Sequence, residues 1–164
     1  MAVRELSAFL WEERQLLDLL VFKLEEESLV LASGRHQWLA RATSEVEFVL
    51  AQIQEMEARR EAEAAGVGVE LGIGGAATLA EIADAAPEPW AGTFRDHRKA
   101  LQAVIGRTQE LALRNKEVLA KYVVAVSDAL SIVGVAGSTP GPAYTADGAV
   151  RRSAGNIRLV DAVS

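Results

Sequence analysis

The chain has 164 residues and a net charge of −6; half of the residues are hydrophobic, 5% are aromatic and none is cysteine. This length and apolar content are sufficient for one folded domain, and the lack of cysteine excludes a disulfide framework, a thiolate nucleophile and a thiolate metal site. An acidic chain without a basic patch is not expected to bind nucleic acid. The charged N-terminus and the absence of an 18-residue apolar run predict neither a signal peptide nor a membrane span.

The first 65 residues predict two helices. Leucines recur at steps of three, four or seven over residues 3–32, which is a helical pattern, and Ser33-Gly34 is a stop signal. Residues 35–42 are expected to form one or two turns, with Trp38 and Leu39 facing inward. The sequence Ser44-Glu45-Val46-Glu47 matches a capping box and predicts a second long helix over 45–65.

Residues 66–77 are glycine-rich and predict a break between helices. A second capping box, Thr78 to Glu81, predicts a short helix over 79–86, which the prolines at 87 and 89 would close. The stretch 72–77 also fits a loose form of the dinucleotide-binding glycine motif. Because no strand precedes it, we interpret it as a flexible connection rather than a nucleotide site.

Residues 91–135 predict one long helix with a continuous 3-4 spacing of core positions, as in coiled coils. At 1.5 Å per residue such a helix spans about 65 Å, so its partners must be the two earlier helices. The sequence therefore predicts an all-α fold, an elongated antiparallel helical bundle or coiled-coil-like hairpin over residues 1–135, followed by a flexible tail over 136–164. The expected core positions are Leu101, Val104, Thr108, Leu111, Asn115, Val118, Tyr122, Ala125, Ala129 and Ile132. Asn115 could set the register of the helices, or it could lie near solvent where they splay apart.

A second apolar stripe follows the last third of this helix, beside the predicted core positions. Two neighbouring helices could not easily cover both stripes, so the second is expected either to be buried by a third helix or a dimer partner or to form a groove for a partner helix. Its members are Leu119, Val123, Val126, Leu130 and Val133.

No pattern in the sequence predicts catalytic chemistry. The carboxylates at 12–13 and 25–27 are interpreted as solvated helix faces, and Arg59-Arg60 as cations that favour the C-terminal end of a helix dipole. His36 and His97 lack a glutamate three residues earlier, so a ferritin-like metal site is not expected. We therefore expect no catalytic residue, no metal and no cofactor, and predict that the protein is not an enzyme.

Three segments together give the chain a resemblance to a known family. Ser44, Glu45, Leu50 and Arg59-Arg60 match a capped second helix; Trp90, Leu111 and Asn115 match a later long helix; and Tyr144, Asp147 and Gly148 match a Tyr-Gly-x-Asp-Gly tail. In this order they resemble the FlgN family of flagellar export chaperones. The chain departs from the family pattern at three positions: the family's lysine is Glu47 here, its second asparagine is Val118 and its tail glycine is Thr145. The glycine-rich stretch 66–77 looks like an insertion relative to the family.

The resemblance implies a cytoplasmic chaperone that binds hook-associated proteins by their C-terminal segments and delivers them to the type III export machinery. It implies that the C-terminal amphipathic helix, with Leu119, Val123, Val126, Leu130 and Val133, binds the cargo. It also implies that Tyr144, Asp147 and Gly148 contact the export-gate membrane protein, which works with the export ATPase complex. The alternative from the residues alone is a structural coiled-coil homodimer that uses the same apolar stripe to close its interface.

Overall fold

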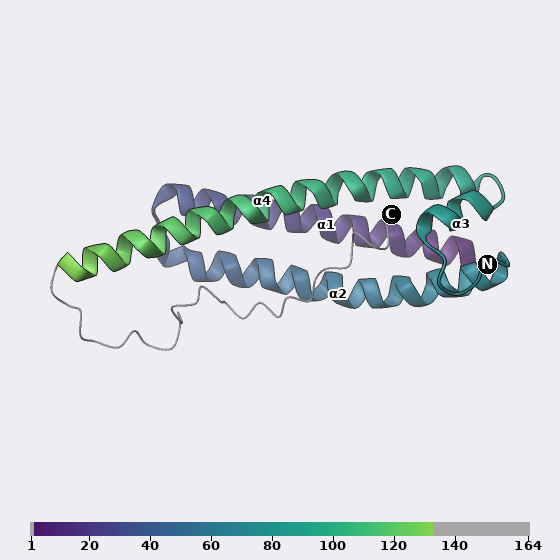
Figure 1. The fold of residues 1–164 in the computed structure, drawn as a ribbon, viewed down its shortest axis with the longest axis horizontal. Helices are drawn as coiled ribbons and strands as arrows, with labels where there is room; N and C mark the ends of the chain where they lie inside the picture. Colours follow the sequence, from purple (N-terminus) through teal and green to yellow (C-terminus); the bar gives the residue numbers. More distant parts are fainter. Residues whose placement is uncertain (1, 133–164) are drawn as a thin grey trace.

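The computed structural model describes residues 2–132, and this part of the chain is almost entirely helical (Figure 1). The helices are α1 (Ala2–Ser33), the 3₁₀ turn η1 (His36–Trp38), α2 (Leu39–Glu70), the short α3 (Leu79–Ala85) and α4 (Trp90–Ile132). The predicted all-α class and elongated bundle are confirmed. Among the described residues no strand is present.

The three long helices lie side by side, with α1 packed against both of the others (Figure 1). α1 and α2 form an antiparallel hairpin. α4 runs parallel to α1, because Ser7 contacts His97 and, further along both helices, Glu27 contacts Asn115. Within the described residues, no Cα atom of α2 lies within 8 Å of one in α4. The central helix α1 therefore holds the assembly together.

The core is built on one seam of α1 that repeats at steps of three and four residues, the spacing that keeps a helix face toward its partners. Fully burying a leucine or isoleucine side chain is worth about 1.5–3 kcal/mol, so this seam supplies much of the stability. The seam comprises Leu6, Leu10, Glu13, Leu17, Leu20, Leu24, Glu27 and Leu31. It meets Val49 and Ile53 of α2 and Phe94 and Leu101 of α4 in a single cluster.

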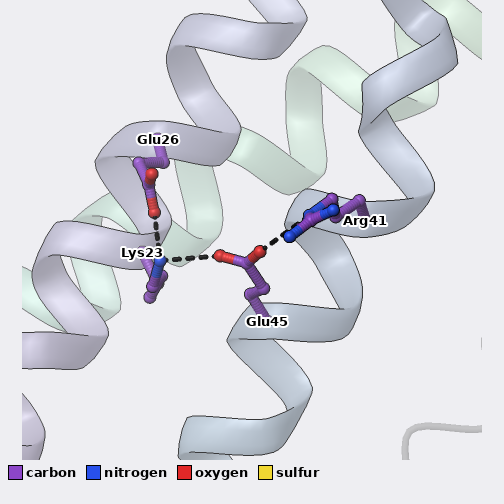
Figure 2. Close-up of polar contacts among 4 residues, drawn as sticks. All are labelled: Lys23, Glu26, Arg41 and Glu45. Atoms are coloured by element: carbon purple, nitrogen blue, oxygen red, sulfur yellow. Dashed lines mark hydrogen bonds and ion pairs between the residues drawn. The ribbon is translucent and has the colours of Figure 1, made fainter.

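The start of α2 differs from the prediction. The helix begins at Leu39 rather than near residue 45, so Ser44 lies within the helix and does not cap it. Leu39 is buried as expected, but Trp38 is 51% exposed. Charged side chains support this first part of α2: Arg41 Nε lies 3.2 Å from Glu45 Oε1 on the same helix, and Glu45 Oε2 lies 2.6 Å from Lys23 Nζ of α1, which also contacts Glu26 Oε2 at 2.6 Å (Figure 2).

The end of α2 also differs, because the helix continues through two glycines to Glu70 instead of ending near residue 65. Val67 in this last part of the helix is fully buried, and its burial offsets the free-energy cost of placing glycine in a helix. Gly68 lies against the following loop, where a Cβ atom would stand 2.1 Å from the carbonyl oxygen of Gly74. The amides of Ile73 and Gly74 in turn donate hydrogen bonds to the Gly68 oxygen at 3.0 and 3.2 Å.

The short helix α3 begins as its sequence predicts. Thr78 and Glu81 form a reciprocal capping box: the Glu81 amide donates to Thr78 Oγ1, and the Thr78 amide donates to Glu81 Oε2. Leu79 and Ile82 are buried against the α1 seam and α4. α3 therefore closes the end of the bundle at which α1 and α4 begin (Figure 1).

Candidate functional site

The end of α4 projects beyond the rest of the bundle (Figure 1). α1 ends at Ser33, and the connection that follows reaches α4 at Tyr122, whose ring stacks on His36 with the ring centroids 3.9 Å apart. The helix continues from Tyr122 to Ile132, a distance of about 15 Å at 1.5 Å per residue. This projecting part has no helical neighbour among the described residues because α1 is too short to follow it.

The last part of α4, which includes the projecting turns, carries exposed and half-buried apolar side chains between Val118 and Leu130. We call these side chains the α4 end surface. Of the residues predicted to form the cargo site, Leu119 is half-buried, while Val123, Val126 and Leu130 are exposed by 49%, 37% and 51%. These four residues follow each other at steps of four, three and four, so they share one face of the helix. The α4 end surface also includes Val118 and Val124.

The sequence pattern placed Val118, Ala125 and Ala129 in the core, but they are exposed. The 3-4 spacing of α4 is buried only through Asn115, with Tyr122 half-buried beyond it. The physical reason is length: the spacing continues along α4 after α1 has ended. The predicted helix over 91–135 is longer than the predicted helix over 3–32. This difference in length is the signal that could have identified Val118 and Val124 as exposed.

The remaining predicted site residues are not placed. Val133 of the cargo stripe lies outside the described residues, and so do Tyr144, Asp147 and Gly148, the predicted export-gate contacts.

A buried polar layer connects all three long helices at the base of the projecting part. Asn115 of α4 donates hydrogen bonds to the Leu24 carbonyl oxygen of α1 at 2.8 Å and to Glu27 Oε2 at 3.0 Å. Thr43 of α2 donates to the other oxygen of Glu27 at 2.8 Å. Asn115 is therefore a core residue with specific partners rather than a residue near solvent, and this geometry fits a role in setting register. Glu27 is buried, so the interpretation of residues 25–27 as a solvated face is wrong for this residue.

A second polar cluster, between α1 and α2, contains two carboxylates and one guanidinium. Arg60 Nε lies 3.0 Å from Glu13 Oε2, and both side chains are buried. Burial is the main cause that raises the pKa of Glu13, opposed by the nearby Arg60 charge. Burial and then repulsion from Glu13 raise the pKa of Glu57 to about 7. Glu13 was predicted to lie on a solvated face, and Arg60 was predicted to lie near the C-terminal end of its helix. Both predictions are wrong: the 3-4 seams of the two helices bury both side chains, and α2 continues ten residues beyond Arg60.

His97 is also largely buried, and its Nε2 lies 3.1 Å from Ser7 Oγ. Burial, followed by the nearby charge of Arg14, lowers the pKa of this imidazole. The pair joins α1 to α4 near the closed end of the bundle. It lies far from the α4 end surface, and we interpret it as a structural contact.

Residues 2–132 contain no cluster of histidine and acidic side chains that could hold a metal ion. In the same part of the chain, no helix is long and apolar enough to cross a membrane. Among the described residues, a surface cavity of about 670 Å³ lies between α1 and α2. A smaller one, about 270 Å³, lies under the loop that precedes α3.

The fold and the α4 end surface define an elongated all-helical protein with an exposed apolar helix end. In a comparison with protein families, residues 1–152 match the model described as FlgN protein. The chain therefore belongs to the FlgN family, the flagellar export chaperones. Searches among curated proteins and among solved structures gave no match.

Proposed function

We propose that this FlgN-family chaperone acts in the cytoplasm, binds the C-terminal segments of hook-associated proteins on its α4 end surface, and delivers them to the export gate. The observation that supports the cargo site is the exposure of Val123, Val126 and Leu130, which lie on one face of α4 where this helix extends beyond α1 and α2. Leu119 and the outlying Val133 would complete the same stripe.

The energetics favour a helical partner. Side chains at steps of four, three and four form the kind of stripe that packs against one amphipathic helix. Since full burial of a valine or leucine is worth about 1.5–3 kcal/mol and these residues are about half exposed, each could contribute about 1 kcal/mol on binding. Lys116, Lys121 and Asp128 are exposed along the same part of the helix and would form a polar rim.

The test is a double variant, Val126→Asp with Leu130→Asp, compared with Leu113→Asp. Leu113 is an equally exposed leucine of α4 that lies before the projecting part, so it controls for the loss of an apolar side chain and the gain of a charge. We expect the double variant to lower affinity for a hook-associated C-terminal segment by about tenfold or more, equivalent to about 1.4 kcal/mol. Leu113→Asp should bind normally, and all variants should keep their helical circular dichroism. Unchanged binding by the double variant would contradict the proposed site.

Delivery is proposed to use the tail residues Tyr144, Asp147 and Gly148, with the export-gate membrane protein and the export ATPase complex as partners. The support is the tail motif together with membership of the family. A single tyrosine on a tether could contact the gate while the α4 end surface holds cargo. Tyr144→Ala should weaken binding to the cytoplasmic part of the gate protein without changing affinity for cargo. Equal gate affinity of the two chains would refute this assignment.

The same exposed stripe also supports a second candidate, a structural homodimer. Two copies could bury residues 119–133 against each other and leave no site for cargo. Light scattering over a range of concentrations distinguishes the two. A dimer that persists on dilution and is broken by Val126→Asp with Leu130→Asp would favour the structural role.

A further inference from the structure

The cavity of about 670 Å³ between α1 and α2 is a groove open to solvent, here called the α1–α2 groove. Its apolar part is formed by Leu16, Leu19 and Met56. Its polar part is formed by Glu12, Gln15, Gln52, Glu55 and Arg59. One turn beyond Leu19, Lys23 forms an ion pair with Glu45 of α2 (Figure 2). The α4 end surface is formed by a different helix.

Exposed aromatic residues stand beside this groove. Trp11 lies one helical turn before Gln15, Phe22 one turn after Leu19, and Phe48 one turn before Gln52. All three side chains are more than half exposed. A groove with an apolar floor and exposed aromatic residues beside it is typical of a surface that binds a peptide segment.

The charge of the surrounding helices defines the chemistry of the segment that would fit. α1 carries seven acidic and three basic residues, and α2 carries the same numbers, so each has a net charge of −4. Arg59, the base within the groove, is already paired with Glu55 at 2.6 Å. A second copy of this acidic surface would be repelled, whereas a basic segment with apolar side chains would be attracted.

The chain itself contains such a segment. Residues 149–160 carry the bases Arg151, Arg152 and Arg158, no acidic residue, and the apolar residues Val150, Ile157, Leu159 and Val160. Most of this stretch lies beyond residue 152, where the match to the family model ends. We propose that residues 149–160 dock in the α1–α2 groove, with the arginines toward Glu12 and the apolar side chains on Leu19 and Met56.

The length of the intervening chain permits this contact. Glu27 of α1 contacts Asn115 of α4, so along the bundle axis Leu19 lies at the height of about residue 107. From that height, α4 extends about 40 Å to Ile132 at 1.5 Å per residue. Residues 133–148 can span about 50 Å when extended. Because a short link between two sites of one chain gives an effective concentration in the mM range, a contact with a Kd of about 1 mM would be occupied about half of the time.

The absence of cysteine allows a clean test on the full chain. A nitroxide attached to Gln52→Cys, in the groove, should reduce the NMR amide signals of residues 149–160 by about twofold, because a contact that is occupied about half of the time places them near the label. A nitroxide on Lys99→Cys, an exposed position of α4 rather than of α1 or α2, is the matched control and should reduce those signals clearly less than the Gln52→Cys label does. Ascorbate reduces the paramagnetic nitroxide to a diamagnetic hydroxylamine, so it should restore the signals and supplies the reference spectrum for each labelled chain.

A charge-reversed tail, with all three arginines changed to glutamate, should restore the signals in the Gln52→Cys chain, and high salt should do so in part. Full signals with the wild-type tail would overturn the proposal. So would signal loss that occurs equally when spin-labelled chains are mixed with separate isotope-labelled chains, because the contact would then join two copies. This test uses no cargo, so it stands apart from the proposed chaperone function.

Discussion

The carboxyl of Glu57 provides the sharpest prediction for stability. Its pKa is raised from 4.5 to about 7 by burial and by the negative charge of Glu13. Between these two pH values the folded protein keeps a proton that the unfolded chain has released, so the stability contribution of Glu57 falls as the pH rises from 4.5 to 7. At 1.36 kcal/mol per pH unit this difference corresponds to at most about 3.4 kcal/mol. The side chain is only half-buried, so solvent screening reduces the expected cost to about 1–2 kcal/mol.

The variant Glu57→Gln removes this cost, since glutamine is neutral at every pH. We expect it to be more stable than the wild type by about 1–2 kcal/mol at pH 8 and nearly equal at pH 4.5, measured by urea unfolding. Glu55→Gln is the matched control, because Glu55 is exposed on the same helix and should change stability little at either pH. A difference between Glu57→Gln and wild type that does not change with pH would refute the reasoning.

Three further predictions concern the packing of the bundle, and urea unfolding measures each. Ile53→Ala empties a fully buried position and should cost about 2–5 kcal/mol; a cost below 1 kcal/mol would mean that the α1–α2 interface is not packed as described. Gly68→Ala should cost about 1–3 kcal/mol because of its contact with the loop before α3. Gly66→Ala, in open space on the same helix, should instead stabilise by about 0.5–1 kcal/mol, and similar effects of the two substitutions would contradict that contact. Asn115→Ala leaves Glu27 with one partner fewer and should cost about 1–3 kcal/mol; a neutral result would show that this polar layer does not hold α4 in register.

Helix type and the α4 pattern could be predicted from the sequence because they depend on spacing alone. The leucine spacing predicts α1, the capping box at Thr78 predicts α3, and the continuous 3-4 pattern predicts α4. The limits of α2 could not be predicted in this way. They go with tertiary contacts that local signals do not contain, namely the ion pair of Glu45 with Lys23 of α1 and the approach of Gly68 to the loop.

Burial of charged residues was the other feature that local patterns missed. Glu13, Glu27 and Arg60 occupy buried 3-4 positions in their helices, but the charge of the two glutamates suggested a solvated face and that of Arg60 suggested a helix end. Each of these side chains has a polar partner on another helix. Such partners cannot be identified from one sequence unless the alignment of the two helices along each other is known. For the α4 end surface, the sequence identified the stripe from Leu119 to Leu130, whereas the exposure of Val118 follows only from where α1 ends.

The central proposal is that the part of α4 beyond Tyr122, which has no helical neighbour among the described residues, takes up cargo. Amide hydrogen exchange of residues 118–131, with and without the C-terminal segment of a hook-associated protein, tests it most directly. We predict fast exchange in this stretch for the isolated protein and strong protection when the segment is added, with little change in the core around Leu17 and Ile53. Slow exchange of residues 118–131 in the isolated protein, or protection by cargo that arises elsewhere and spares this stretch, would contradict the claim.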